Sequence, residues 1–359
     1  MFTVLRCFVG YDAVLLCQFL WTQSVDRATR VPAFAAVARM MLGCGVLEYV
    51  LCAPELRMKP TATEYRNGNP IAHDGYHARQ NGRWADDKLA FLDRYLVPAL
   101  RIAGAHFAHR VYLDFFAGPG VFFDERSKDF LPGGAIRVLD GASDAAHSRS
   151  HQFTHAILVN LDEEDHRALS ARVERLHEQG RLTIPRGNIQ LIQGDANEVV
   201  RLLARLLPPR PYVFAFVDPE SPGQWPWESL VALRKAVPHA LDLYVLYPSM
   251  MGINRLIPYQ GNPLERALTA YFGSDEWRPI VAARQSIADS PEMRQDLEAL
   301  YERRLATLGL AYVRRVRRIR RTGACELYTM FFASRKPVAA KLAGWEMDSF
   351  GDQLGLFAS

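Results

Sequence analysis

A glycine-rich turn follows one apolar stretch of the sequence. VYLDFF (111–116) continues as AGPG (117–120), so two glycines lie where a strand would pass into a helix. Glycines at such a turn let the backbone approach a ligand closely, because no side chain stands in the way. The spacing matches neither the GxGxxG of dinucleotide-binding proteins nor a Walker loop, which ends in Gly-Lys-Ser/Thr. Alone, the turn fits either a ligand site or a tight connection that binds nothing.

Acidic residues end two further apolar stretches. Asp162 and Glu163 follow the second stretch, where an acid can accept hydrogen bonds from the two hydroxyls of a ribose. Asp195 and Ala196 follow the third, where a carboxylate beside small residues suits the amino group of an adenine. The alternative for Asp162 and Asp195 is that each caps the helix that follows it. The position of Asp162, one strand–helix unit after the glycine turn, favours the ribose.

The fourth apolar stretch ends in the acidic loop DPESPG (218–223). Pro219 gives this loop a defined shape, because proline fixes its own φ. Asp218 is expected to hold the N–H or O–H of a nucleophile and to take up its proton, or to orient it. The alternative is an acid that only ends a strand in a surface loop.

The sequence contains five nearly continuous apolar stretches: 111–116, 156–162, 189–195, 212–218 and 241–248. The first four end in the turns described above. Such stretches are typical of parallel strands that are buried on both faces. Helical segments alternate with them, which predicts an α/β fold with a doubly wound, Rossmann-like sheet. Ligands of such sheets bind at the carboxyl ends of the strands, so the turns are expected to meet at one edge.

Two helices and a hairpin are predicted after the fifth stretch. The helices occupy an insertion over 252–310, and the hairpin over 311–335 turns at Thr322–Gly323. Its first strand contains Arg314, Arg315, Arg317, Arg318, Arg320 and Arg321. These arginines suit the phosphate backbone of a nucleic acid, with Arg314, Arg317 and Arg318 as the predicted contacts. The alternative is an edge strand whose charges prevent aggregation.

The succession of four such strand ends resembles the class I S-adenosylmethionine-dependent methyltransferases over roughly residues 84–335. The resemblance implies a glycine loop for the methionine part of the cofactor and an antiparallel seventh strand paired with the sixth. It implies that S-adenosylmethionine is bound by Asp114, Phe115, Ala117, Gly118, Gly120, Asp162, Glu163, Asp195 and Ala196. It also implies that Lys88, on the helix before the first strand, lies near the cofactor's carboxylate; an exposed helical lysine is the alternative.

A narrower resemblance rests on WADDKLAFLDRYL, LDFFAGPG, FVDPESPGQWPW, YFGSDEWRPI and LYTMFFASRK. Together these segments are similar to the three-Cys-motif partner protein family of bacteria, over about residues 76–345. That family is methyltransferase-like and is named for its neighbourhood with a radical-S-adenosylmethionine-type protein, which is the implied partner. The three cysteines belong to that neighbour, so Cys7, Cys17 and Cys44 are not expected to bind a cluster.

The loop after Asp218 departs from the pattern of nucleic-acid amino-methyltransferases, many of which carry Asp/Asn-Pro-Pro-aromatic. Here Glu220 replaces the second proline, and the aromatic residue that stacks on a flipped base is missing. Trp225 and Trp227 are candidate replacements, with Pro219 also bordering the substrate; the alternative is that both tryptophans are core. The departure weakens the case for methylation at adenine N6 more than it weakens the case for cofactor binding.

Three functions follow as hypotheses. The first is a methyltransferase acting on nucleic acid, with Asp218 as the catalytic residue. The second is a catalytically silent cofactor-binding module that partners a radical-S-adenosylmethionine-type protein or a phage-defence system. The third is a small-molecule methyltransferase, favoured if the arginines are dispensable and the helices of the insertion form a closed lid.

The composition indicates a globular chain, because 49% of its 359 residues are hydrophobic and 23% are charged. Residues 1–57 are apolar and are expected to form a helical extension that packs on the core; the alternative is a natural start at Met58. Residues 58–83 are predicted as a polar linker, 84–345 as the methyltransferase-like domain and 346–359 as a tail.

The five cysteines form no close CxxC pair, so no metal site is predicted, and they indicate free thiols in a reducing cytosol. The two most apolar stretches of the N-terminal region are interrupted by Asp12 and Glu48, so no membrane span is expected. The start lacks a clear signal cleavage site. A cytoplasmic protein without membrane contact is therefore predicted.

Overall fold

The computed structural model describes residues 65–66, 68–81, 84–125, 127–142, 152–249, 253, 263–283, 291–320 and 326–344. All of them belong to the second of two compact units, Thr61–Ser359. The predicted extension 1–57 and the tail 346–359 lie outside the described residues. No helix within the described ranges is long and apolar enough to span a membrane.

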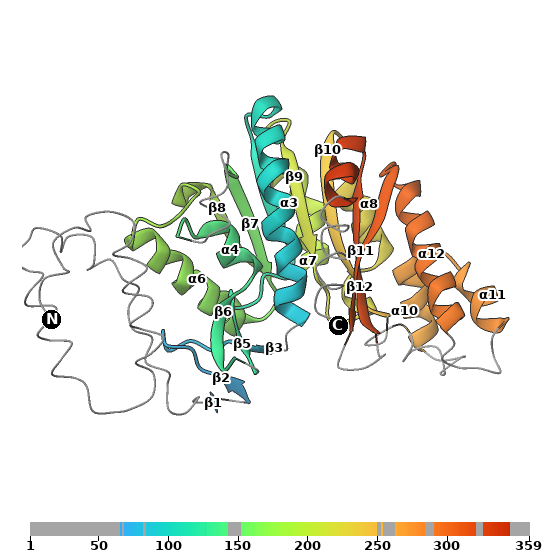
Figure 1. Ribbon diagram of the computed structural model, residues 1–359, viewed down its shortest axis with the longest axis horizontal. Helices are drawn as coiled ribbons and strands as arrows, with labels where there is room; N and C mark the ends of the chain where they lie inside the picture. Colours follow the sequence, from blue (N-terminus) through green and yellow to red (C-terminus); the bar gives the residue numbers. More distant parts are fainter. Residues whose placement is uncertain are drawn as a thin grey trace, which may run out of the picture. The chain divides into compact units, whose positions relative to one another are not determined.

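A seven-stranded sheet forms the centre of this unit (Figure 1). Five neighbouring strands run parallel, and two strands at one edge run antiparallel to their neighbours. In spatial order the strands are β11 (Tyr312–Arg320), β12 (Glu326–Ser334), β10 (Ala240–Tyr247), β9 (Tyr212–Val217), β4 (Arg110–Asp114), β7 (His155–Asn160) and β8 (Ile189–Gln193). The predicted fold class, including the antiparallel C-terminal hairpin, is confirmed.

Alternate residues of the central strands enter two separate hydrophobic cores. On β9, Val213 and Val217 belong to one core, whereas Phe214 and Phe216 belong to the other. Successive side chains of a strand point to opposite faces of a sheet. Because both faces are covered, both sets are apolar, and the stretch reads as continuously hydrophobic.

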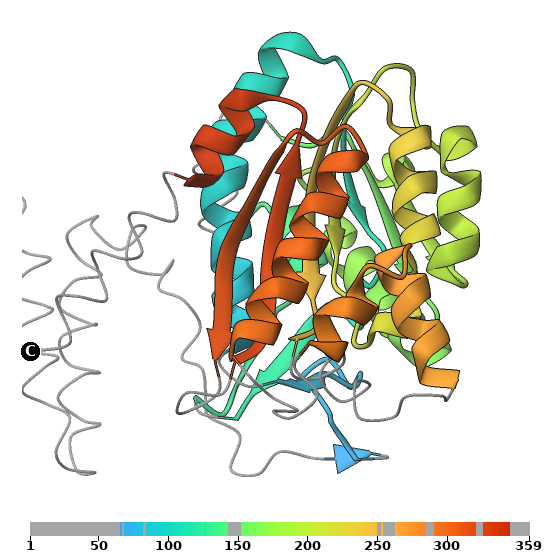
Figure 2. The same ribbon diagram turned by 90° about the vertical axis from the view of Figure 1, so that its right-hand side faces the viewer.

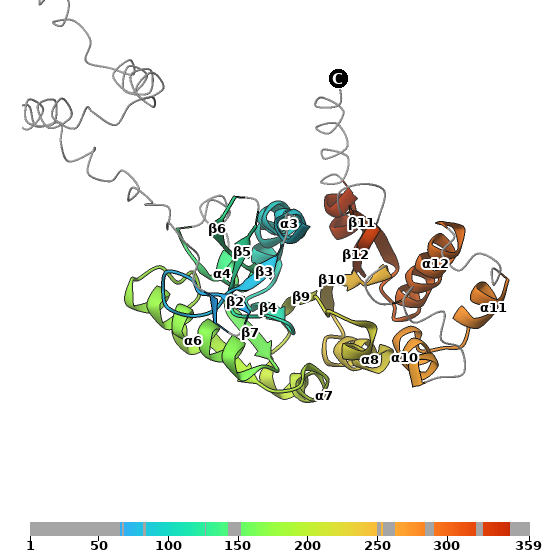
Figure 3. The ribbon, with the colours of Figure 1, turned by 90° about the horizontal axis from the view of Figure 1, so that it is seen from below.

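Helices cover both faces of the sheet, as Figure 3 shows for α3 and α4 on one side and α7 and α8 on the other. One face carries α3 (Trp84–His106), α4 (Gly134–Leu139), α6 (Glu163–Glu178) and helical residues 337–344. The other carries α7 (Ala196–Leu206), α8 (Trp227–Ala236), α10 (Pro263–Phe272), α11 (Trp277–Ala282) and α12 (Pro291–Thr307).

Short strands join the segment before α3 to the chain that follows the glycine turn. β3 (Arg79–Asn81) pairs in parallel with β5 (Val121–Asp124), and β5 pairs antiparallel with β6 (Asp129–Pro132). β1 (Tyr65–Arg66) and β2 (Asn69–Pro70) form a separate ribbon. The described part of the segment expected to be a polar linker is therefore attached to the main domain.

β11 is the edge strand of the large sheet. Its pairing with β12 shifts register between Arg315 and Arg317, so Val316 forms a bulge. Before the bulge, Val313 belongs to the core that contains α12, whereas Val316 packs against the opposite core. The bulge interrupts the two-residue alternation of the stretch, because β11 advances by two residues at this point while β12 advances by one.

Arg315 connects the edge strand to α12, which lies along the hairpin in Figure 2. Its Nε donates to Glu302 Oε2 at 3.0 Å, and its Nη1 donates to Glu298 Oε2 at 3.4 Å. Glu298 is only 1% exposed, and Thr329 Oγ1 also donates to it, at 2.6 Å. Arg314, the preceding residue of the strand, is exposed. Of these two arginines, one therefore neutralises a buried acid and the other faces solvent.

Replacing Arg315 with alanine should lower the free energy of unfolding by about 2–3 kcal/mol, because the buried Glu298 would lose its ion pair with Arg315. Arg314→Ala is the matched control and should change the free energy of unfolding by less than about 0.5 kcal/mol. Urea unfolding followed by circular dichroism measures both values. Equal losses in the two variants would contradict the assignment.

Candidate functional site

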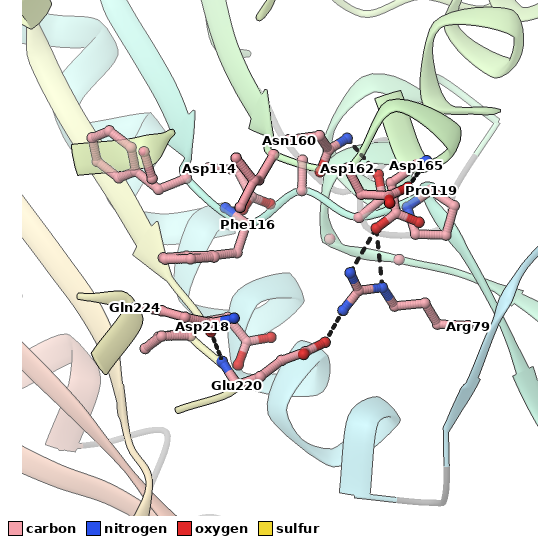
Figure 4. A pocket seen from close by; sticks show the side chains of 18 of the residues that line it. Arg79, Asp114, Phe116, Pro119, Asn160, Asp162, Asp165, Asp218, Glu220 and Gln224 are labelled. Atoms are coloured by element: carbon pink, nitrogen blue, oxygen red, sulfur yellow. Dashed lines mark hydrogen bonds and ion pairs between the residues drawn. The ribbon is translucent and has the colours of Figure 1, made fainter. Parts of the chain in front are cut away.

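A cleft of about 1340 Å³ lies at the carboxyl ends of β4, β7, β8 and β9 (Figure 4). In the sheet, β4 lies between β7 and β9. The connections that leave neighbouring strands at such a point turn to opposite sides, which opens a crevice between them. The strand-end turns meet at one edge, as expected.

Most of the predicted site residues line this cleft: Lys88, Asp114, Phe115, Ala117, Gly118, Gly120, Asp162, Glu163, Asp195, Ala196, Asp218 and Pro219. Trp225 and Arg314 do not line it. The side chains of Arg317 and Arg318 lie outside the described part of the chain. Lining residues that the sequence analysis did not single out include His77, Arg79, Phe116, Asn160, Asp165 and Gln224.

The glycine turn requires glycine at two positions. Gly118 and Gly120 have φ angles of 61° and 85°, a region that residues with a Cβ rarely adopt. A Cβ on Gly120 would also lie 2.8 Å from Leu169 Cδ1, so the turn packs directly on α6. Asn160 Nδ2 donates to the carbonyl of Gly118 at 2.8 Å. This bond fixes the turn against the end of β7.

A buried arginine of α6 also holds the glycine turn. Arg172 is 5% exposed, and its Nη1 donates to the carbonyl of Pro119 at 2.6 Å. Its Nε and Nη2 bind the two carboxylate oxygens of Asp74 at 2.7 and 3.0 Å, and Nη2 also donates to the carbonyl of Tyr76 at 3.3 Å. Burial alone would raise the pKa of Asp74, but the hydrogen bonds and charge of Arg172 lower it.

We call residues 69–81 the strap, because they connect to α6 at a second point as well. His77 Nε2 lies 2.7 Å from Asp165 Oδ1, and Arg79 Nη2 donates to Asp165 Oδ2 at 2.6 Å. Arg79 Nη1 pairs with Glu220, in the loop after β9. Asp165 follows Arg79 by 86 residues, so no local pattern indicated these contacts. The strap therefore supplies lining residues that the sequence analysis missed.

Asp114 is a buried acid at the end of β4, with 1% of its surface exposed. Its carboxylate accepts hydrogen bonds from the backbone N–H of Phe116 and from the hydroxyl of Tyr112, both at 3.1 Å. Burial raises the pKa of Asp114 to about 7, although these hydrogen bonds act to lower it. The group therefore titrates near neutral pH beside the cleft.

Asp162 and Asp195 both cap helices. Asp162 Oδ1 accepts from the backbone N–H of Asp165, and Asp195 Oδ1 accepts from that of Asn197, each at 2.8 Å. The capping alternative is thus confirmed for both acids. Both side chains are exposed and line the cleft. Because the caps use Oδ1, they are compatible with ligand binding through Oδ2.

Asn160 is a candidate ligand-binding residue that the sequence analysis missed. It is the last residue of β7, is 5% exposed and lines the cleft. Its side-chain Nδ2 donates to the glycine turn, while its side-chain oxygen Oδ1 can accept a hydrogen bond. The signal in the sequence was a polar side chain that ends an otherwise apolar stretch.

Lys88 and Asp218 form an ion pair at the cleft. Lys88 Nζ contacts Asp218 Oδ2, and the two side chains are only 15% and 16% exposed. The alternative of an exposed helical lysine is therefore wrong. The ammonium lies against the predicted catalytic acid, and its proximity to a cofactor carboxylate stays a prediction.

Trp225 and Trp227 belong to the core, which confirms the core alternative for both and corrects the assignment of Trp225 to substrate binding. Trp225 is 1% exposed, and its ring centroid lies 4.7 Å from that of Phe115. Trp227 is also buried, and a Cβ on Gly273 would lie 2.2 Å from its Cγ. Phe116 is a half-buried aromatic residue that does line the cleft.

No model of a known protein family matches the chain, and no curated protein matches its sequence. The resemblance to the three-Cys-motif partner family therefore stays a prediction. Solved structures of methyltransferases are similar in fold. Trm1 from Pyrococcus horikoshii, in complex with S-adenosyl-L-methionine, is 15% identical with a TM-score of 0.38, over 79% of this chain and 63% of Trm1.

Two further solved structures show the same range of similarity. The putative methyltransferase yhhF from Escherichia coli is 13% identical with a TM-score of 0.34, over 78% of this chain and 99% of yhhF. The O-methyltransferase TomG from Streptomyces achromogenes, in complex with SAM, is 13% identical with a TM-score of 0.36, over 70% of this chain and 80% of TomG. At these identities the likeness concerns the fold alone.

Relative to the wild type, the Asp114→Asn variant should gain free energy of unfolding as the pH rises from 5 to 8. The folded-state pKa of Asp114, about 7, lies above its ordinary value of 3.8, so the folded state retains a proton that the unfolded state has lost. Between these values the wild type loses about 1.4 kcal/mol of unfolding free energy per pH unit, and asparagine removes this loss. Urea unfolding at several pH values measures the difference. Parallel pH profiles of the two proteins would refute the assignment.

Proposed function

We propose that this chain is a methyltransferase that uses S-adenosylmethionine, and that the cleft binds this cofactor together with the methyl acceptor. One observation carries the proposal: the glycine turn, the acids Asp162 and Asp195, and the carboxylate of Asp218 all border a single cleft at the switch point of the sheet. Each group suits a different part of the same pair of ligands.

The lining of the cleft suits the cofactor. The ribose hydroxyls and the adenine amino group are hydrogen-bond donors, and Asp162, Asn160 and Asp195 offer acceptor oxygens. At Gly118 and Gly120 the backbone borders the cleft without a Cβ. The described lining contains the acids Asp114, Asp162, Glu163, Glu164, Asp165, Asp195, Asp218 and Glu220. Their summed potential favours a ligand that carries the positive charge of a sulfonium.

The chemistry asked of the protein is mainly positioning. Bound S-adenosylmethionine supplies a methyl group on a positively charged sulfur. Asp218 accepts a hydrogen bond from the N–H or O–H of the acceptor, orients it, and takes up the proton that it loses. Lys88 holds the carboxylate of Asp218 in place through their mostly buried ion pair.

We infer that the acceptor belongs to a nucleic acid. β12 runs opposite to β10, and β11 runs opposite to β12, so β11 runs toward the edge of the sheet that bears the cleft. Near this end Ile319 pairs with Tyr328, and Tyr328 lines the cleft. The backbone positions of Arg317, Arg318 and Arg320 support the proposal that these arginines bind phosphates at the rim of the cleft. The acidic cleft itself would then receive the target base.

We also propose kinship with the three-Cys-motif partner family of bacteria. The motifs that carry this resemblance include LDFFAGPG and FVDPESPGQWPW, which supply the glycine turn and the loop of Asp218. On this proposal the partner is a radical-S-adenosylmethionine-type protein, and the location is the bacterial cytoplasm.

Isothermal titration calorimetry should detect binding of S-adenosylmethionine, and the double change Asp162→Ala and Glu163→Ala should abolish it. Asp218→Asn should bind the cofactor like the wild type, because Asp218 acts on the acceptor. It should transfer labelled methyl groups to tRNA, rRNA or DNA at least about 100-fold more slowly.

Glu174→Gln, which alters an exposed ion pair outside the cleft lining, is the control for these variants and should keep both activities. A folded wild type that binds no cofactor would refute the proposal. Cofactor binding without transfer to any nucleic acid would favour the silent partner module or a small-molecule methyltransferase instead.

Changing Arg317, Arg318 and Arg320 together to alanine should weaken binding to single-stranded RNA and reduce its salt dependence. Loss of three phosphate contacts should decrease the slope of log K against log salt by about 2. Fluorescence anisotropy at several salt concentrations measures this slope. Alanine at Arg181, Arg186 and Arg201, which lie outside the cleft lining, is the matched control. An unchanged slope in the first variant would exclude these arginines as phosphate ligands.

A further inference from the structure

The strap places a guanidinium in the wall of the cleft, where Figure 4 shows it between Asp165 and Glu220. The side chain of Arg79 is 43% exposed, whereas that of its partner Asp165 is 6% exposed. Arg79 Nε and Nη2 donate to Asp165 Oδ2 at 3.2 and 2.6 Å. Asp165 also contacts His77, which belongs to the strap. Two nitrogens on a buried, hydrogen-bonded acid fix the orientation of the guanidinium.

The third nitrogen of Arg79 has a more exchangeable partner. Nη1 pairs with Glu220, whose side chain is 65% exposed. Ion pairs between exposed groups contribute little to stability, because water competes for both charges. An oxygen of a bound ligand can therefore replace Glu220 at small cost, while Asp165 keeps Arg79 in position.

An anionic group that enters this cleft has few other partners. Eight of the described lining residues are acids, and the arginine and lysine side chains of the described lining are Arg79 and Lys88. Lys88 is paired with Asp218, and both side chains are mostly buried, so that pair is harder to exchange. His77 is directed to Asp165. The charge distribution thus favours Arg79 as the binding partner of a negative group.

We propose that Arg79 binds an anionic oxygen of the ligand, a carboxylate or a phosphate, through Nη1 in exchange for Glu220. The proposal deepens the proposed function and rests on it. Arg79 borders both parts of the cleft, since its Nε lies 3.8 Å from the position of a Cβ on Gly118, and its Nη1 reaches the loop that carries Asp218. The carboxylate of the cofactor and a phosphate of the acceptor are the two sources of such an oxygen.

The first arm of the test distinguishes the carboxylate. Calorimetry compares S-adenosylhomocysteine, which has a carboxylate, with 5′-methylthioadenosine, which has none. If the carboxylate is the ligand, Arg79→Ala should weaken binding of S-adenosylhomocysteine about 10- to 100-fold and leave that of 5′-methylthioadenosine unchanged. Glu220→Gln should strengthen binding of S-adenosylhomocysteine by up to about fivefold, because it removes the competing charge.

The second arm distinguishes the phosphate. A single-stranded RNA oligonucleotide is titrated into protein saturated with S-adenosylhomocysteine. If a phosphate is the ligand, Arg79→Ala should weaken RNA binding by the same factor and leave the affinity for S-adenosylhomocysteine unchanged. Glu220→Gln should strengthen RNA binding.

Arg181→Ala is the matched control, because Arg181 is also 43% exposed, pairs with Asp140 and lies outside the cleft lining. It should leave all affinities unchanged. Glu220→Gln keeps the test decisive if Arg79→Ala fails to fold, since Glu220 is exposed. A wild type that binds S-adenosylhomocysteine while both variants keep every affinity within twofold overturns the role of Arg79 alone. A wild type that binds neither nucleoside nor RNA overturns the proposed function as well.

Discussion

The geometry of the cleft depends on the buried guanidinium of Arg172. A charge removed from water is tolerated only with close, well-oriented partners. Here the partners come from separate segments: Asp74 and the carbonyl of Tyr76 in the strap, and the carbonyl of Pro119 in the glycine turn. Since Arg172 lies on α6, one side chain ties the strap and the turn to the helix that follows β7. The turn therefore has a fixed shape in which Gly118 and Gly120 present backbone to the cleft.

The charges around the cleft follow from its position on the sheet. Parallel strands end at one edge, and acids that end strands or cap the following helices gather there. The cations come from other segments: Lys88 from α3 and Arg79 from the strap. Their exposure differs, and so does their availability. Lys88 is held in a mostly buried pair with Asp218, whereas one nitrogen of Arg79 pairs with the exposed Glu220.

The arginine-rich strand shows that neighbouring residues of one sequence motif can occupy different structural environments. Arg315 pairs with the buried Glu298 of α12 and so links the edge strand to that helix. Arg314 is exposed one residue earlier on the strand. The later arginines follow the bulge at Val316, close to the edge that bears the cleft. A count of positive charges does not make this distinction, because it depends on which face of the strand each residue occupies.

Local sequence patterns were sufficient to predict the strands of the large sheet, the helices between them and most of the strand-end residues that line the cleft. Buried parallel strands are continuously apolar, and their ends are marked by glycine or acids, so this information is local; it led to the glycine turn, Asp162, Asp195 and Asp218. Three-dimensional contacts were needed to find that Trp225 is core, that Lys88 pairs with Asp218 and that the strap lines the cleft. Burial and ion pairing join residues that are far apart in the chain, such as Arg79 and Asp165, and no local pattern indicates which distant partner a side chain will contact.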